Sequence, residues 1–283
     1  MFSTPTPKSL MLVGALVAFS TSFAAAAEAT RVVFQNGRSV LMSAVAIEGD
    51  RLLIKTAGDG FNSGQSFLLA GVSHVYGEKP ANINLGIALL LTGKPGEALN
   101  LLEPILAEHR VTAGFPGNFW LDSARAALVA HALAGNLAKV TEIGKQITDA
   151  TPAQGADPFN ALGRALLMPA SAKAEDRETA LRDLTTDNLP ADLCAYASFF
   201  RAELLKSLGR DVDALEAYLM VPCLFPAGGM ILNGAAELNA AGLIAALGTE
   251  RRTEAVELLK SALREAAGTV IAVEANKRLE SLE

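Results

Sequence analysis

The chain has 283 residues, of which 51% are hydrophobic and 19% are charged, and its formal net charge is −6 at pH 7. This composition supplies enough apolar residues for a sizeable core and excludes general disorder. The acidic chain has no block of Lys and Arg, so it lacks the clustered charge that nucleic acids and membrane surfaces require. We therefore expect no nucleic-acid partner.

The N-terminus predicts a signal peptide over residues 1–27. Lys8 gives a short basic start, residues 10–19 form an apolar run, and residues 24–27 are four consecutive alanines. Signal peptidase selects small side chains at two positions, and Ala25 and Ala27 supply them. The apolar run is too short for a comfortable membrane span. We therefore expect an exported, periplasmic protein with no integral membrane segment after cleavage; the alternative is an uncleaved N-terminal anchor.

Residues 30–78 predict a small five-stranded module that resembles a β-barrel. β-branched and aromatic runs at 31–34, 39–47, 51–56, 65–69 and 72–76 alternate with turn signals such as Asn36-Gly37. Strands this short bury one face only by curling into a barrel. The stretch resembles the small barrels of the Sm-like type. That resemblance implies a structural or docking module, because a nucleic-acid role would need clustered basic loops.

From residue 81 onward the apolar pattern changes to the helical period, and four similar joints recur. Each has a glycine between two Ala- and Leu-rich runs, and the four glycines are separated by 42, 74 and 39 residues. Because 74 is twice 37, the separations fit one repeat of nearly constant length. A repeat of this length is typical of stacked helical hairpins. The four glycines of these joints are Gly93, Gly135, Gly209 and Gly248.

The region 81–283 resembles the tetratricopeptide-repeat (TPR) family. In its best-matching unit Ala202 is the small residue of the first helix, Gly209 forms the joint, Tyr218 is the aromatic of the second helix, and Pro226 closes the unit. The resemblance implies an all-α solenoid of about five hairpins, closed by a more polar helix near 270–282. The fold class expected for the whole chain is therefore α+β. The resemblance also implies a protein or peptide partner.

The first helices of such a stack would line a concave groove. Ile83, Ile87 and Leu90 recur at intervals of four and three, which places them on one helical face. We expect this face either to bind a partner in the groove or to pack against the β module. In the first and fourth hairpins the residues expected to face the groove are Ile83, Ile87, Leu90, Tyr196, Phe199, Glu203 and Lys206.

The segment between the first and second hairpins concentrates aromatic residues in a chain with only 6% aromatics. Phe115, Phe119 and the sole tryptophan, Trp120, lie within six residues of one another. Aromatic side chains anchor many interfaces, so this segment is a candidate anchor for a partner. The alternative is that these rings begin the next helix and pack on the preceding one.

Two cysteines, Cys194 and Cys223, lie at the start and the end of the fourth hairpin. Antiparallel helices bring those two ends together, and an exported compartment permits disulfides. The hypothesis of a disulfide stands beside that of two buried thiols, since Cys is among the most buried residue types.

No motif in the chain demands catalysis, a cofactor or a metal. It has no phosphate-binding glycine loop, no paired histidines on a helix and no nucleophile elbow. His74, His109 and His131 are far apart in the sequence, so we expect surface or half-buried histidines rather than ligands. The function expected is a non-enzymatic binding scaffold. The alternatives are a structural subunit of a cell-envelope assembly and, less favoured, a small-molecule-binding protein.

Overall fold

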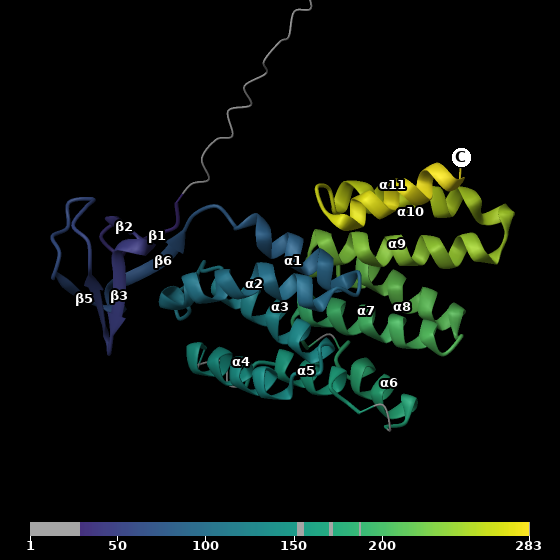
Figure 1. The fold of residues 1–283 in the computed structure, drawn as a ribbon, viewed down its shortest axis with the longest axis horizontal. Coiled ribbons are helices and arrows are strands. Elements are labelled where there is room, and N and C mark those ends of the chain that lie inside the picture. The colour runs from purple at the N-terminus through teal and green to yellow at the C-terminus, as the bar shows by residue number, and fades with distance from the viewer. Residues whose placement is uncertain (1–28, 152–155, 170–171, 187, 283) are drawn as a thin grey trace, which may run out of the picture.

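The computed structural model describes residues 29–151, 156–169, 172–186 and 188–282. The predicted signal peptide and its cleavage region before residue 29 lie outside these residues. The described chain is α+β: a small β module at one end is followed by an array of helices (Figure 1). The strands are β1 (Arg31–Phe34), β2 (Ser39–Leu41), β3 (Val45–Glu48), β4 (Arg51–Ile54), β5 (Ser66–Leu68) and β6 (Val72–Tyr76).

The β module is built from two small antiparallel sheets, with strand orders β2-β1-β6 and β3-β4-β5. Alternate residues of β1 and β4 point inward, as the period of two predicts, and bury Val32, Phe34, Leu52 and Ile54. The ring of Phe34 lies 5.5 Å from that of Phe61 and 5.0 Å from that of Phe67, measured between centroids. This apolar cluster is the core of the module.

The expectation of a closed five-stranded barrel is wrong, because neither sheet closes. The predicted strand at 39–47 is interrupted by a 3₁₀ turn at Met42–Ala44, which separates β2 from β3. That turn passes the chain from one sheet to the other, so the two halves of the run pair with different neighbours. The strands have only three to five residues. The two sheets therefore share one apolar core but do not join into a continuous hydrogen-bonded barrel.

The helices follow the β module in antiparallel succession, each packed against the next. Their bounds are α1 (Ala81–Leu91), α2 (Pro95–His109), α3 (Trp120–Leu133), α4 (Leu137–Ala150), α5 (Phe159–Leu166), α6 (Ala174–Arg182), α7 (Ala191–Ser207), α8 (Asp211–Leu224), α9 (Met230–Leu247), α10 (Arg252–Glu265) and α11 (Val270–Leu282).

Three of the four predicted joints have the same conformation. Gly93, Gly135 and Gly209 have φ of +79°, +74° and +72°, a region that L-residues with a side chain rarely adopt. After each glycine, the next N–H donates to the carbonyl five residues earlier, as Lys94 does to Leu89 at 2.9 Å. The fourth joint differs, because Gly248 has φ +141° and a 3₁₀ turn follows it.

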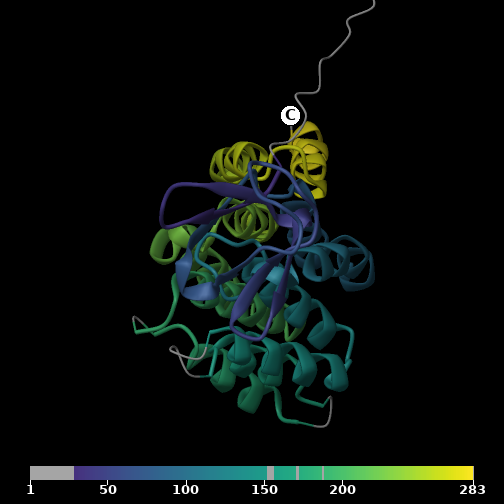
Figure 2. The same ribbon diagram turned by 90° about the vertical axis from the view of Figure 1, so that its left-hand side faces the viewer.

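The helical array curls back on itself. Besides α2 and α3, helix α1 packs against α9 and α11, which lie far along the chain. Helix α9 is therefore covered on most sides, and it passes through the middle of the helical part when the molecule is viewed from the β module (Figure 2). Among the described residues α9 is also long and apolar enough to cross a bilayer, but 67% of it is buried, as in the core helix of a globular protein.

The segment between α2 and α3 joins the β module to the helices. Phe115 packs in the core of the β module, whereas Trp120 is buried in the helical core. The Val75 N–H of the edge strand β6 donates to the carbonyl of Pro116 at 2.8 Å. Gly117 follows with φ +75°, and a Cβ there would lie 2.5 Å from the Val75 carbonyl oxygen. This segment therefore holds the two modules against each other.

Replacing Glu237 of α9 with glutamine is expected to stabilise the protein at neutral pH. Glu237 is 8% exposed, and its Oε2 has no hydrogen-bond partner among the described residues. Burial raises the pKa of Glu237, although a hydrogen bond from Ser261 opposes the effect. A raised carboxyl pKa gives stability that is complete below the unfolded-state value and is lost as pH rises through the folded-state value.

The measurement is urea unfolding of both proteins at about pH 4 and about pH 8. Glu237→Gln should gain stability at the higher pH and show a flatter pH dependence than the unmodified chain. Glu257→Gln is the control, because the Glu257 side chain is 65% exposed and pairs with Lys260 at 2.8 Å. An unchanged pH profile in Glu237→Gln would contradict the prediction.

Candidate functional site

A pocket of about 520 Å³ lies where α1, α3, α5, α7 and the start of α9 meet. It forms where the N-terminal ends of α3, α7 and α9 converge, beside one face of α1. The residues that line it are Lys79, Asn84, Ile87, Asp122, Arg125, Ala126, Phe159, Ala191, Asp192, Tyr196 and the run 227–232.

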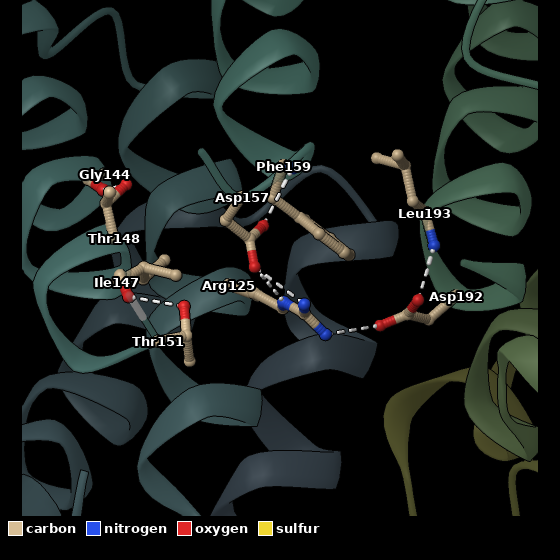
Figure 3. Close-up of polar contacts among 9 residues, drawn as sticks. All are labelled: Arg125, Gly144, Ile147, Thr148, Thr151, Asp157, Phe159, Asp192 and Leu193. Atoms are coloured by element: carbon tan, nitrogen blue, oxygen red, sulfur yellow. Dashed lines mark hydrogen bonds and ion pairs between the residues drawn. The ribbon is translucent and has the colours of Figure 1, made fainter. Parts of the chain in front are cut away.

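Arg125 of α3 lines the pocket and lies between two carboxylates, those of Asp157 and Asp192 (Figure 3). Its guanidinium contacts Asp157 at 2.7 Å and Asp192 at 3.1 Å, and it lies over the Phe159 ring at 4.8 Å. The Asp157 side chain is 1% exposed, and its second oxygen accepts the Phe159 N–H at 2.9 Å, which caps the start of α5. These contacts tie α3, α5 and α7 together behind the pocket.

A second ion pair stands at the mouth of the pocket. Lys79 Nζ lies 2.8 Å from Asp122 Oδ2, and about half of each side chain is exposed to solvent. Asp122 is in the first turn of α3, where a carboxylate interacts favourably with the helix dipole, and Asp192 has the same place in α7. An exposed pair of this kind contributes little to stability and can exchange partners with a ligand.

Tyr196 of α7 is the most deeply buried of the polar side chains that line the pocket. The residue is 5% exposed, and its ring packs edge-on to that of Phe159 with centroids 5.7 Å apart. Burial raises the pKa of Tyr196, and the carboxylates of Asp192 and Asp122 raise it further, so the phenol stays protonated.

The opposite wall is apolar. It is formed by Ile87 of α1, which is half-buried, and by the first turn of α9. Met230 is 60% exposed at the lip of this wall. The preceding Gly228 lets the chain pass close to α7, since a Cβ there would lie 2.4 Å from the Cβ of Ala195. The pocket therefore has one charged wall and one apolar wall.

The structure brings only two of the predicted groove residues into this pocket, Ile87 and Tyr196. Ile83, Leu90 and Phe199 are at most 1% exposed, so they do not face a groove. Helices α9 and α11 pack against α1, where an open solenoid would leave a free face, and the ring of Phe199 packs on that of Tyr218 in α8 at 5.6 Å between centroids.

The two remaining predicted groove residues lie outside the pocket. Glu203 is half-buried and accepts a hydrogen bond from the Tyr218 hydroxyl. Lys206 is exposed near the end of α7. Both therefore lie toward the C-terminal end of α7, whereas the pocket lies at its N-terminal end.

The aromatic segment serves the fold rather than an open surface. Phe115 and Trp120 are buried, and Phe119 is half-buried against the ring of His109 at 5.7 Å between centroids. Their placement therefore agrees with the alternative that these rings pack inside the protein. His109 and His131 are themselves buried, which differs from the expectation of surface or half-buried histidines.

The two cysteines are not joined by a disulfide. Cys194 is buried at the start of α7, where its Sγ faces the Thr186 carbonyl at 3.5 Å. Cys223 is exposed near the end of α8. The thiol of Cys194 points toward the α6–α7 connection, so the two side chains do not share the space between α7 and α8. The alternative of two buried thiols is right for Cys194 alone.

Sequence reasoning missed most of the charged wall of the pocket. Asp122 and Arg125 are three residues apart, which places them on one face of α3, and Asp192 opens α7 in the same way. These spacings were a usable signal for each helix separately. The meeting of the three helices was not, because it depends on the angles between successive hairpins.

Within the part of the chain that the structure describes, no group of three or more His, Cys, Asp or Glu side chains could hold a metal ion. The groups that the pocket presents are two carboxylates, an ammonium, a guanidinium, a phenol hydroxyl and an apolar wall. Comparison of the chain with models of protein families, with curated proteins and with solved structures finds no match.

Proposed function

We propose that the protein is an exported, non-enzymatic scaffold whose TPR-like helical hairpins hold a protein or peptide. The observation that carries this proposal is the pocket at the N-terminal ends of α3, α7 and α9, with one apolar and one charged wall. Its volume of about 520 Å³ accommodates a few side chains of an extended or helical segment. The signal-like N-terminus supports a periplasmic location, and the β module acts as a docking or structural part.

The test is binding to an array of immobilised apolar dodecapeptides. Ile87→Glu is expected to abolish binding, because it places a charge on the apolar wall, while the melting temperature stays nearly unchanged since Ile87 is only half-buried. Ile83→Glu is expected to lower the melting temperature instead, because it buries an unpaired charge.

Val212→Glu is the matched control, since Val212 is 69% exposed and lies outside the pocket. This variant should bind like the unmodified protein. If Ile87→Glu retained the full binding pattern, the pocket would not be the binding site.

One observation favours the second candidate function, a structural subunit of an envelope assembly. Large apolar side chains are exposed to solvent at the joints α3–α4, α7–α8 and α9–α10. Permanent partners often cover such surfaces. Size-exclusion chromatography separates the two functions, because a stable, soluble monomer supports the scaffold. The exposed residues at these joints are Leu133, Leu137, Leu208, Val212 and Leu247.

A further inference from the structure

Two Asn-Gly pairs occur in the chain, and the fold places them in opposite environments. Asn36-Gly37 lies in the turn between β1 and β2, whereas Asn233-Gly234 lies inside α9. In such a pair the side-chain amide is open to attack by the next backbone nitrogen, because glycine has no side chain to obstruct the approach. The local structure therefore decides which of the two pairs reacts.

The turn at Asn36 leaves this approach open. Residues 35–38 are all exposed, and a Cβ at Gly37 would meet nothing within 4 Å among the described residues. The Asn36 Oδ1 accepts the Arg38 N–H at 3.1 Å, so the side chain folds back across Gly37. That hydrogen bond also draws electron density from the amide carbon of Asn36. The carbon that would be attacked is therefore held beside the turn and polarised.

The second pair is enclosed. Asn233 is 8% exposed, and its Nδ2 donates to the carbonyl of Pro226 at 3.2 Å. A Cβ at Gly234 would lie 3.0 Å from the Cβ of Ala266, so this turn of α9 is packed against the end of α10. Closing a ring between a side chain and the next backbone nitrogen requires main-chain angles outside the helical range. Helix α9 would have to unwind locally before Asn233 could react.

We propose that Asn36 is a site of spontaneous deamidation, through which the β1–β2 turn acquires a carboxylate. The Gly37 nitrogen gives up its proton to a base and bonds to the Asn36 Cγ. The side-chain nitrogen then gains a proton and leaves as ammonia, which produces a five-membered cyclic imide. Water opens the imide at either of its carbonyls. One opening gives aspartate at position 36, and the other gives isoaspartate, in which the main chain runs through the former side chain.

The modification should also change the pairing beside the turn. The Gly37 N–H donates to the Phe34 carbonyl at 2.9 Å, and this single bond at the exposed tip must open before the nitrogen attacks. The Phe34 N–H donates to the Arg38 carbonyl at 2.8 Å and closes the same turn. Isoaspartate inserts an extra methylene into the main chain, so the distance across the turn changes. We therefore expect the Phe34–Arg38 hydrogen bond to be lost in the isoaspartyl product.

The test incubates the purified protein at mildly alkaline pH, with and without urea, and follows both asparagines by peptide mapping and mass spectrometry. In the folded protein the Asn36 peptide should exchange an amino group for a hydroxyl at least about tenfold faster than the Asn233 peptide. In urea the two rates should become similar, because neither pair keeps its folded environment. The rate at Asn36 should rise in proportion to the hydroxide concentration, because the attacking nitrogen must lose its proton.

Asn36→Ser is the matched variant. Serine has no amide to lose, but its hydroxyl oxygen can accept the Arg38 N–H, so the melting temperature should stay nearly unchanged. Hydrogen exchange then reports the structural effect. On ageing, protection of the Phe34 amide should fall in the unmodified protein and persist in Asn36→Ser.

Two outcomes would overturn the proposal. If Asn36 lost its amide only in urea, the hydrogen bond from Gly37 to Phe34 would be what protects the turn. If Asn36 and Asn233 reacted equally fast in the folded protein, the fold would not select between the two pairs.

Discussion

Replacing Asp157 with alanine is expected to lower the free energy of unfolding by about 3 kcal/mol. The Asp157 side chain is 1% exposed and contacts the Arg125 guanidinium at 2.7 Å. Its removal leaves Arg125, which is 15% exposed, with the single longer contact to Asp192. It also removes the oxygen that accepts the Phe159 N–H at 2.9 Å, so α5 loses its cap. Arg125 then lacks its closest partner and α5 lacks its cap, and both changes destabilise the folded state.

Urea unfolding followed by circular dichroism measures this loss. Asp157→Asn divides it into its two parts, because asparagine keeps an oxygen for the cap and loses the charge. That variant should therefore fall between alanine and the unmodified chain. The control is Asp213→Ala, whose ion pair with Arg210 has a similar 2.7 Å distance but is almost half exposed. Equal losses in Asp157→Ala and Asp213→Ala would mean that burial of the pair does not matter.

The same substitution should reach the pocket, since Arg125 stands between the two carboxylates in Figure 3. Without Asp157, the guanidinium has Asp192 as its remaining close anion. The guanidinium should then move toward Asp192, so Asp157→Ala should alter the charged wall of the pocket even though Asp157 does not line it.

Features with a local cause could be predicted from the sequence. The positive φ of Gly93, Gly135 and Gly209 follows from a glycine placed after an apolar helical run, which depends on a few neighbouring residues. Buried Ala214 and Tyr218 in α8 follow from helical spacing.

Features that depend on the angles between distant elements could not be predicted. The curl of the array is the sum of small rotations between hairpins, and each is set by side chains in contact. A Cβ at Gly86 would lie 2.8 Å from Leu102, and one at Gly163 would lie 2.8 Å from Leu128, so these helices approach closely. The helical spacing of Ile83 and Leu90 predicts an open groove, whereas both residues are buried in α1, against which α9 and α11 pack.

The candidate site could be predicted in part. The pattern identified Ile87 and Tyr196, because both lie on the inner face of a first helix. It gave no sign that Arg125 pairs with Asp157, since the two residues are 32 positions apart and meet only because α5 packs on α3. The division of the β region into two sheets was missed for a similar reason, since the turn at 42–44 contains no glycine or proline.

Replacing Gly117 with alanine is expected to lower the free energy of unfolding by about 2–4 kcal/mol. Gly117 has φ +75°, and a Cβ would lie 2.5 Å from the carbonyl oxygen of Val75. That oxygen belongs to strand β6, so the clash cannot be relieved by turning a side chain. The segment must instead move away from the strand, which lengthens the hydrogen bond from the Val75 N–H to Pro116.

Gly135 provides a matched control, because its φ of +74° is nearly the same and a Cβ there would meet nothing within 4 Å. Gly135→Ala should therefore show the backbone strain alone, about 1 kcal/mol. Hydrogen exchange of the Val75 amide reports the contact directly, and its protection should fall in Gly117→Ala and persist in Gly135→Ala. If the two variants lost equal stability and Val75 stayed protected in both, the segment at 115–117 would not be what holds the β module to the helices.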